Sequence, residues 1–233
     1  GIAARKVATQ VDEGAAIVVV AADAEQPFAS RGATKLLGAL AAFTRHGLVV
    51  RGRRCLDAGA STGGFTDVLL REGAREVVAV DVGYGQLAWR LQQDPRVQVR
   101  DRTNVRDLTL DLVGGPVDLV VADLSFISLR LVLPALAGVC APSGDLLLMV
   151  KPQFEVGRQH LPDGGVVRDP RLRRDAVLRI GAAAAELGWG AAGVTASPLP
   201  GPAGNVEYFL WLRQGSGPLD AAAVQRAIEE GPT

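Results

Sequence analysis

The segment from Leu56 to Phe65, LDAGASTGGF, constrains the fold more than any other, because an apolar run there ends in an acid and a glycine-rich turn follows. This pattern predicts a buried strand, a tight turn and the start of a helix. Glycines let backbone N–H groups approach a ligand closely, and a helix N-terminus favours negative charge. We therefore expect a cradle for a nucleotide-type cofactor.

The glycine spacing narrows the kind of cofactor. Dinucleotide-binding turns use GxGxxG, whereas Gly59 is followed by glycines only at Gly63 and Gly64, and no GxxxxGK[ST] motif indicates ATP or GTP hydrolysis. A second predicted strand ends in Asp81, an acid placed to accept hydrogen bonds from ribose hydroxyls. Asp57, the glycine turn and Asp81 together resemble the S-adenosylmethionine site of class I methyltransferases. The alternative is an ordinary strand-to-helix turn with a surface acid.

Composition restricts the class of protein. Of the 233 residues, 48% are hydrophobic, which is enough for one α/β domain with small appendages. Lysine plus arginine and aspartate plus glutamate number 25 each, so the net charge gives no sign of nucleic-acid binding. Apolar runs such as 146–150 are far shorter than the roughly 20 residues of a membrane span, and no leader-type segment opens the chain. We expect a cytoplasmic protein without stable membrane insertion.

The cysteines and histidines argue against disulfides and metals. Cys55 and Cys140 fall on or near predicted buried elements, so we expect both to be reduced packing residues. With only His46 and His160 and no CxxC motif, a metal site finds too few ligands, and we predict none.

Alternating apolar runs and helical patterns predict a doubly wound α/β sheet. Seven strands are expected, at 54–57, 76–81, 97–100, 117–123, 145–150, 191–196 and 207–213. Helices are expected at 30–44, 65–71, 86–92, 129–139, 170–187 and 220–230. Because only the loop SPLPGPAGN links the last two strands, the seventh is expected to run antiparallel. The fold class is thus a Rossmann-like, mostly parallel sheet with an antiparallel last strand.

Four charged residues are expected to meet at the carboxyl edge of this sheet, where open α/β sheets bind ligands. Lys35 lies on the first helix, Asp123 and Lys151 end two strands, and Glu207 opens the antiparallel strand. We expect Lys151 to accept the proton of a ribose 2'-hydroxyl during methyl transfer, with Asp123 orienting the lysine or the hydroxyl. Lys35 and Glu207 would balance the charge. The alternative is a buried ion-pair network that only joins four elements.

These four residues resemble the K-D-K-E tetrad of the FtsJ-type ribose 2'-O-methyltransferases. More narrowly, six segments are similar, in order, to the blocks of the TlyA family of hemolysin-like rRNA 2'-O-methyltransferases: SRGATKL, CLDAGASTGGFTDVLL, DVGYGQLAW, DLVVADLSFISL, LMVKPQFEVG and SPLPGPAGNVEYFLWL. The resemblance implies S-adenosylmethionine as cofactor and cytidine riboses of small- and large-subunit rRNA as substrate. It also implies sensitivity to capreomycin-type antibiotics through that methylation, with ribosomal RNA or ribosomal subunits as partners.

The same comparison yields a set of expected cofactor contacts, namely Asp57, Gly59, Ala60, Ser61, Gly63, Gly64, Phe65, Asp81, Thr103, Asn104 and Asp123. The turn would line the methionine moiety, Asp81 the ribose, and Asn104 or its neighbour Thr103 the adenine edge. Phe126 is expected to pack on substrate or adenine, with a plain core aromatic as the alternative. For RNA phosphates the candidates are Arg31, Arg168 and Arg171, with a solvated surface as the alternative.

Members of the TlyA family begin with an S4-type RNA-binding domain, and this comparison predicts the domain organisation. Residues 1–21 resemble only the last strands of such a domain, so we expect a remnant of it there. A linker at 22–30, the FtsJ-like methyltransferase domain at 31–214, and a C-terminal helix and tail at 215–233 would follow.

Two other functions compete with this interpretation. An amino-directed methyltransferase would carry an acid, two prolines and an aromatic at 123–126, but the sequence there is DLSF, and Lys151 and Glu207 would be idle. A membrane-active hemolysin would need apolar segments of about 20 residues or alternating strands of about 10. The alternating strands are already used in the predicted sheet.

Overall fold

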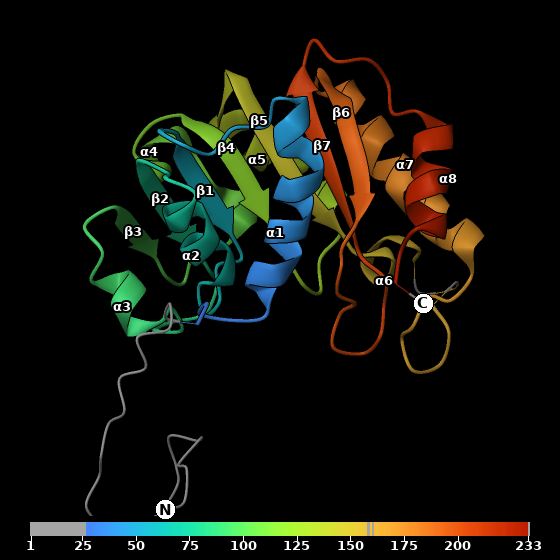
Figure 1. The fold of residues 1–233 in the computed structure, drawn as a ribbon, viewed down its shortest axis with the longest axis horizontal. Helices are drawn as coiled ribbons and strands as arrows, with labels where there is room; N and C mark the ends of the chain where they lie inside the picture. The colour runs from blue at the N-terminus through green and yellow to red at the C-terminus, as the bar shows by residue number, and fades with distance from the viewer. Residues whose placement is uncertain (1–26, 158, 160, 233) are drawn as a thin grey trace, which may run out of the picture.

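The computed structural model describes residues 27–157, 159 and 161–232, and its centre is a seven-stranded sheet covered on both faces (Figure 1). The strands are β1 (Arg54–Ala58), β2 (Glu76–Val80), β3 (Val97–Arg100), β4 (Val117–Ala122), β5 (Cys140–Val150), β6 (Trp189–Ala196) and β7 (Tyr208–Gln214), in the order β3-β2-β1-β4-β5-β7-β6. Neighbours pair in parallel except at β7, which runs antiparallel to both β5 and β6. The predicted Rossmann-like sheet is confirmed.

Several strand ends differ from the predicted ones, by one to five residues; among them, β7 begins at Tyr208, so Glu207 lies just before it. β5 begins at Cys140 rather than at Asp145, because Cys140 already pairs with Val117 before the register shifts. β6 likewise begins two residues early, at Trp189. Asp81 and Asp123 lie just past β2 and β4 instead of within them, so their side chains belong to the loops of the carboxyl edge.

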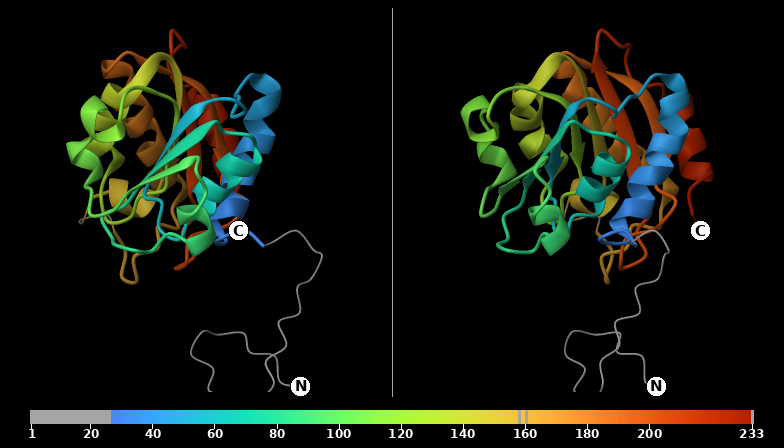
Figure 2. Two further views of the ribbon diagram at one scale, coloured as in Figure 1. Left: turned by 90° about the vertical axis from the view of Figure 1, so that its left-hand side faces the viewer. Right: turned by 60° about the vertical axis from the view of Figure 1, so that its left-hand side comes forward.

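Helices cover the two faces of the sheet in separate groups (Figure 2). One face carries α1 (Gly32–Phe43), α2 (Gly64–Arg71) and α3 (Trp89–Gln92), and the other carries α4 (Leu110–Val113), α5 (Leu129–Val139), α7 (Pro170–Glu186) and α8 (Ala221–Glu229). Alternate strand residues supply the two cores: Val77 and Ala79 pack on the side of α1 and α2, whereas Val78 and Val80 pack on the side of α5. All four are at most 2% exposed, so the sheet is buried on both faces.

The helices differ from the predicted ones mainly in short segments. α4 and α6 (Pro152–Glu155) were not expected, because four residues are too few to show a helical period. The helix expected at 86–92 begins only at Trp89, since Ala88 is extended with ψ of 136°. Two 3-10 turns, Thr44–His46 and Val105–Asp107, complete the described elements. Ser30 lies one residue before the N-cap of α1, and its hydroxyl accepts from the N–H of Gly32 at 3.2 Å.

Both cysteines are free and buried, as expected, and burial raises the pKa of each thiol to about 12. Within the described ranges, no helix has the length and apolarity that crossing a membrane requires, and no cluster of three or more His, Cys, Asp or Glu side chains forms a candidate metal site. Residues 1–26 lie outside the described residues. The S4 remnant at 1–21 and the other domain boundaries therefore stay predictions.

Candidate active site

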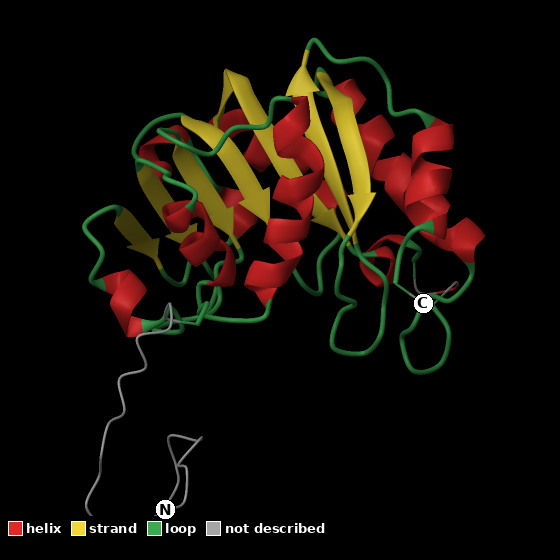
Figure 3. Ribbon diagram, in the orientation of Figure 1, coloured by secondary structure: helices red, strands yellow, loops and turns green. Residues whose placement is uncertain are grey.

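Two adjoining cavities open among the loops at the carboxyl edge of the sheet, the lower edge in Figure 3. The first cavity, of about 270 Å³, is lined by Ser30, Arg31, Gly32, Lys35, Gly59, Ala60, Ser61, Thr62, Gly64, Phe65, Asp123, Ser125, Lys151 and Pro202. The second cavity, of about 520 Å³, is lined by Gly59, Ser61, Asp81, Val82, Gln86, Asn104, Val105, Asp123, Leu124, Ser125, Phe126, Ile127 and Val132. The two cavities share the glycine turn and the start of the loop after β4.

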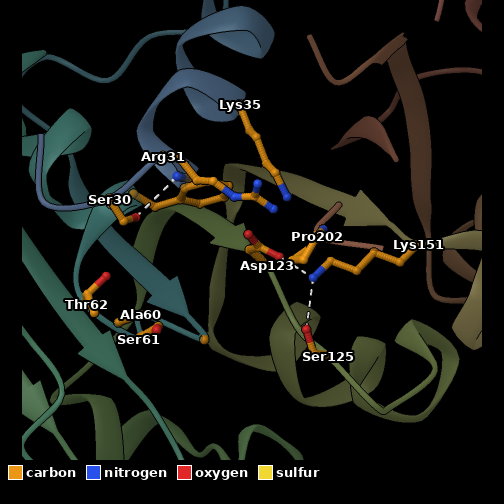
Figure 4. A pocket seen from close by; sticks show the side chains of 14 residues that line it. Ser30, Arg31, Lys35, Ala60, Ser61, Thr62, Asp123, Ser125, Lys151 and Pro202 are labelled. Carbon is orange, nitrogen blue, oxygen red and sulfur yellow. Dashed lines mark hydrogen bonds and ion pairs between the residues drawn. The ribbon is translucent and has the colours of Figure 1, made fainter. Parts of the chain in front are cut away.

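The four charged residues predicted to converge form two ion pairs. Lys35 Nζ lies 2.5 Å from Glu207 Oε2, and the two residues are 4% and 1% exposed. Lys151 Nζ lies 2.5 Å from Asp123 Oδ1. Lys35, Asp123 and Lys151 line the first cavity, and Figure 4 shows the two lysine side chains entering the region of Asp123 from different directions, with Lys151 paired to it. Glu207 does not line the cavity, but its carboxylate compensates the positive charge of Lys35.

The Lys35–Glu207 pair depends on a close approach between α1 and the loop before β7. A Cβ atom at Gly38 would come within 2.6 Å of Pro198, and one at Gly201 would come within 2.6 Å of Glu207 Oε1. Because glycine lacks Cβ, these positions let the loop pack against both the helix and the carboxylate. Removing one partner of such a buried pair typically costs about 3–5 kcal/mol, because the other charge is left uncompensated.

The glycine turn after β1 is fixed by Asp81. Its Oδ2 accepts from the N–H of Ser61 at 2.8 Å, and its Oδ1 accepts from the N–H of Gly83 at 2.7 Å. At Gly59, with φ of +87°, a Cβ atom would lie 2.6 Å from the carbonyl oxygen of Asp123. Only glycine therefore lets the turn touch the loop that carries Asp123, which joins the walls of the two cavities.

Asp57 lies fully buried beneath this turn and lines neither cavity. Thr66 Oγ1 donates to its Oδ2 at 2.7 Å, whereas Oδ1 has no hydrogen-bond partner among the described residues. Burial raises the pKa of this carboxyl to about 7, the hydrogen bond from Thr66 opposes the rise, and Asp123 and Asp81 add to it. A carboxylate with an unpartnered buried oxygen next to two other acids fits a positively charged ligand such as S-adenosylmethionine.

The lining of the second cavity decides between alternatives that the sequence left open for Asn104, Thr103 and Phe126. Asn104 lines it, whereas Thr103 does not, and the Thr103 hydroxyl donates to the carbonyl of Asp101 at 3.1 Å. Phe126 lines the same cavity and is 92% exposed, so the alternative of a plain core aromatic is wrong.

The other predicted contacts divide between the cavities and the core. Ala60, Ser61, Gly64 and Phe65 line the first cavity, and Arg31 lies at its wall. Gly63 lines neither cavity: it is the N-cap of α2, where a Cβ would come within 2.3 Å of Leu91. Arg168 and Arg171 are exposed around the start of α7 and line neither cavity.

Sequence reasoning missed several residues that line the cavities, chiefly Ser125, Ser30, Gln86 and Pro202. Ser125 carried a signal, because it lies two residues past Asp123 in a loop at the carboxyl end of a strand. Pro202 carried a weaker one, because it belongs to a proline- and glycine-rich turn at 200–204, but its place in the first cavity depends on how the loop between β6 and β7 folds back.

Comparison with known proteins gives consistent results. Residues 28–214 match the model of the FtsJ-like methyltransferase family. The chain is 60% identical over 237 residues to the 16S/23S rRNA (cytidine-2'-O)-methyltransferase TlyA of Mycobacterium tuberculosis, covering 100% of this chain and 87% of that protein. It is 42% identical over 209 residues to a protein of Bacillus subtilis named "Putative rRNA methyltransferase YqxC", covering 87% of this chain and 73% of that protein. A solved structure titled "Putative hemolysin from Streptococcus thermophilus" is similar, with a TM-score of 0.82 and 38% identity over 90% of this chain and 76% of that one.

Proposed function

The chain belongs to the TlyA branch of the FtsJ-like methyltransferase family, and from that premise we propose that it methylates the ribose 2'-hydroxyl of cytidines in 16S and 23S rRNA, using S-adenosylmethionine. One observation carries the proposal: two lysine–carboxylate pairs converge at a cavity that adjoins a second one of about 520 Å³. The second volume lies within the range of about 300–1,000 Å³ typical of small-molecule sites. Ribosomal RNA as substrate gives the protein a cytoplasmic place of action.

The residues of the two cavities fit the cofactor in a defined orientation. Asn104 and Asp81 would hold the adenosine part in the second cavity, and the turn at Gly59–Ser61 would hold the methionine part where the cavities meet. Asp57 beneath the turn would compensate the positive charges of the ligand. When bound, the cofactor supplies an electrophilic methyl group on a positively charged sulfur.

Lys151 is the proposed base. In its neutral form, it accepts the 2'-hydroxyl proton as the oxygen attacks, and Asp123 at 2.5 Å stabilises the ammonium that results. Lys35, held by Glu207, presents a second positive charge to the same cavity and stabilises negative charge on the attacking oxygen. Fixing the hydroxyl between these groups supplies much of the remaining rate enhancement.

Exposed side chains around the cavities are the proposed RNA contacts. Arg31 at the wall of the first cavity would bind a phosphate close to the target ribose, and Arg168 and Arg171 would bind phosphates further along the strand. The exposed ring of Phe126 offers a stacking surface for a base, an interaction worth about 1–3 kcal/mol.

The structure supports the two rival functions less well. A hemolytic activity would leave both lysine–carboxylate pairs and the glycine turn without a role. An amino-directed methyltransferase would not need a lysine against Asp123, and the loop after β4 lacks the two prolines of such enzymes.

The test is transfer of tritiated methyl from S-adenosylmethionine to isolated 30S and 50S subunits, followed by digestion to nucleosides. We expect the label in 2'-O-methylcytidine. Label in a base-methylated nucleoside would favour the amino-directed alternative. Failure to bind the cofactor in calorimetry would refute the proposal.

A further inference from the structure

Ser125 lies where the two cavities meet and is in contact with the proposed base. Its side chain lines both cavities, and Lys151 Nζ donates to Ser125 Oγ at 3.1 Å (Figure 4). Asp123, two residues earlier in the same loop, forms an ion pair with that amine through Oδ1 at 2.5 Å. The loop after β4 therefore contacts the Lys151 amine through two side chains, Asp123 and Ser125.

This loop is tied to the segment after Lys151 by a carboxylate outside the cavities. Glu155 Oε2 accepts from Ser128 Oγ at 2.6 Å, and its Oε1 accepts from the N–H of Leu129 at 2.8 Å. Glu155 lies four residues past Lys151, and Ser128 lies three residues past Ser125. These hydrogen bonds consequently fix the segment that carries Ser125 relative to the segment that carries Lys151.

An aromatic contact reinforces the same connection. Phe126, the residue after Ser125, has a φ of +64°, a conformation that costs a non-glycine residue about 1–3 kcal/mol. Its ring lies 5.4 Å from that of Phe154, between centroids. Strained conformations persist where the surroundings fix them, and this one fixes the direction of the chain directly after Ser125.

The valences of the amine explain why two acceptors matter. A neutral lysine amine has two N–H groups and one lone pair. Asp123 Oδ1 and Ser125 Oγ stand against Lys151 Nζ, so when each faces an N–H, the lone pair is left for the first cavity that Lys151 lines. With Asp123 alone, rotation about the Cε–Nζ bond would let an N–H take the place of the lone pair.

We infer that Ser125 is a positioning residue, the second acceptor that directs the Lys151 lone pair at the ribose hydroxyl. The inference rests on the proposed function, with Lys151 as base. In this role, Ser125 neither gains nor loses a proton, and it acts only through the orientation of the amine.

The experiment compares the wild-type chain with Ser125→Ala, Ser125→Thr and a remote control, Ser216→Ala, in single-turnover methylation of ribosomal subunits at saturating cofactor. Ser216 follows β7 at the opposite edge of the sheet. We expect Ser125→Ala to lower the rate constant about tenfold, a fraction of the ~10²–10⁴ that a general base supplies. Cofactor affinity should stay within about twofold and Tm within about 2 °C. Ser125→Thr, which keeps the hydroxyl, should restore the rate, and Ser216→Ala should match the wild type.

Three results would overturn the inference: a wild-type rate for Ser125→Ala, a loss that follows cofactor affinity or Tm, or no rescue by threonine. The nucleoside digest separates this failure from failure of the proposed function. Wild-type label outside the ribose 2'-oxygen refutes the function and the role of Ser125 with it. Ribose methylation at an undiminished rate by Ser125→Ala refutes only the role of Ser125.

Discussion

Buried charges gather at both edges of the sheet, but only at one edge do they have all their partners. At the amino edge, Asp145 is fully buried and accepts from Trp211 Nε1 at 2.7 Å, from Arg213 Nε at 2.9 Å and from Arg53. At the carboxyl edge, Asp57 Oδ1 accepts from no described residue, and Lys151 faces a cavity. Both edges therefore hold buried charged side chains. They differ in hydrogen-bond saturation, that is, in whether every polar atom of these side chains has a partner within the protein. This difference distinguishes a structural cluster from a functional site.

Arg54, at the start of β1 on the amino edge, likewise has several hydrogen-bond partners within the protein. Its guanidinium donates to Glu76 at 3.0 Å and to the carbonyls of Val113, Gly115 and Pro116 at 2.5 to 3.3 Å. Side chains with this many partners have little capacity left for a ligand. The amino edge therefore joins strands to loops, and the carboxyl edge is left for chemistry.

The largest expected effect is loss of methyl transfer in Lys151→Ala. A general base supplies about 10²–10⁴ in rate, and we expect a loss of about 10³-fold, or about 4 kcal/mol of transition-state stabilisation. Asp123 Oδ1, the partner of Lys151, is buried, but the Asp123 side chain as a whole is 22% exposed, so Tm should fall less than for a fully buried pair. Single-turnover methylation and calorimetric cofactor binding measure the two effects separately. A variant that keeps more than a tenth of the wild-type rate would contradict the assignment of the base.

The matching substitution at the amino edge, Asp145→Ala, should act on stability instead. It leaves three donors without their acceptor, and we expect the free energy of unfolding to fall by about 3 kcal/mol. The lower part of the usual range applies because Arg53 and Arg213 retain 21% and 36% exposure of their side chains. Urea unfolding measures the loss. The folded fraction should methylate at the wild-type rate, and a rate loss beyond that fraction would show that the two edges are not independent.

The sequence predicted the architecture well because its signals are local. Strand and helix periods and glycine turns locate β1 to β7, and strand ends alone place Asp123 and Lys151 at one edge. The sequence assigned Asp123 to orient Lys151 or the hydroxyl, and Lys35 with Glu207 to balance the charge, but it did not predict which of these side chains are in contact. Whether Lys35 meets Glu207 or Asp123 depends on the rotation of α1 and on the fold of the loop before β7, which are tertiary properties.

Hydrogen-bond saturation was equally hidden in the sequence. Asp57 and Asp145 both occur in apolar strands, yet only the structure shows that one has three donors and the other an unpartnered oxygen. The sequence also could not show that, of the adjacent residues Thr103 and Asn104, only Asn104 lines the second cavity. Periodicity identifies which elements bear polar residues, whereas cavities and partners depend on how the loops close over the sheet.

Protein stability and cofactor affinity should both depend on pH because of Asp57, the buried acid with an unpartnered oxygen. The pKa of Asp57 is about 7 in the fold, because of burial, against an ordinary value of 3.8, so the folded state holds its proton more tightly than the unfolded state. Stability should accordingly fall as pH rises between about 4 and 7. The positive cofactor favours the ionised carboxyl, so its affinity should rise about tenfold between pH 6 and pH 8, with release of a proton.

Calorimetry in two buffers of different ionisation enthalpy measures the released proton. Asp57→Asn, which keeps an acceptor for Thr66, is the matched control and should lose the pH dependence of both stability and binding. Cofactor affinity that is independent of pH in the wild type would show that Asp57 does not face the bound charge.

The smallest expected effect applies the same saturation argument to two adjacent residues. The Thr103 hydroxyl already donates to Asp101 and lines neither cavity. Asn104 lines the second cavity, and although its Oδ1 accepts from the N–H of Arg106 at 3.0 Å, its amide nitrogen can still donate to a ligand. Asn104→Ala should raise the cofactor dissociation constant about fivefold, the value of one net hydrogen bond of about 1 kcal/mol. Thr103→Val should leave it within about twofold, because the Thr103 side chain lines neither cavity and so has no contact with the ligand to lose. Equal effects of the two substitutions in calorimetry would mean that saturation in the free protein does not predict which side chains bind the cofactor.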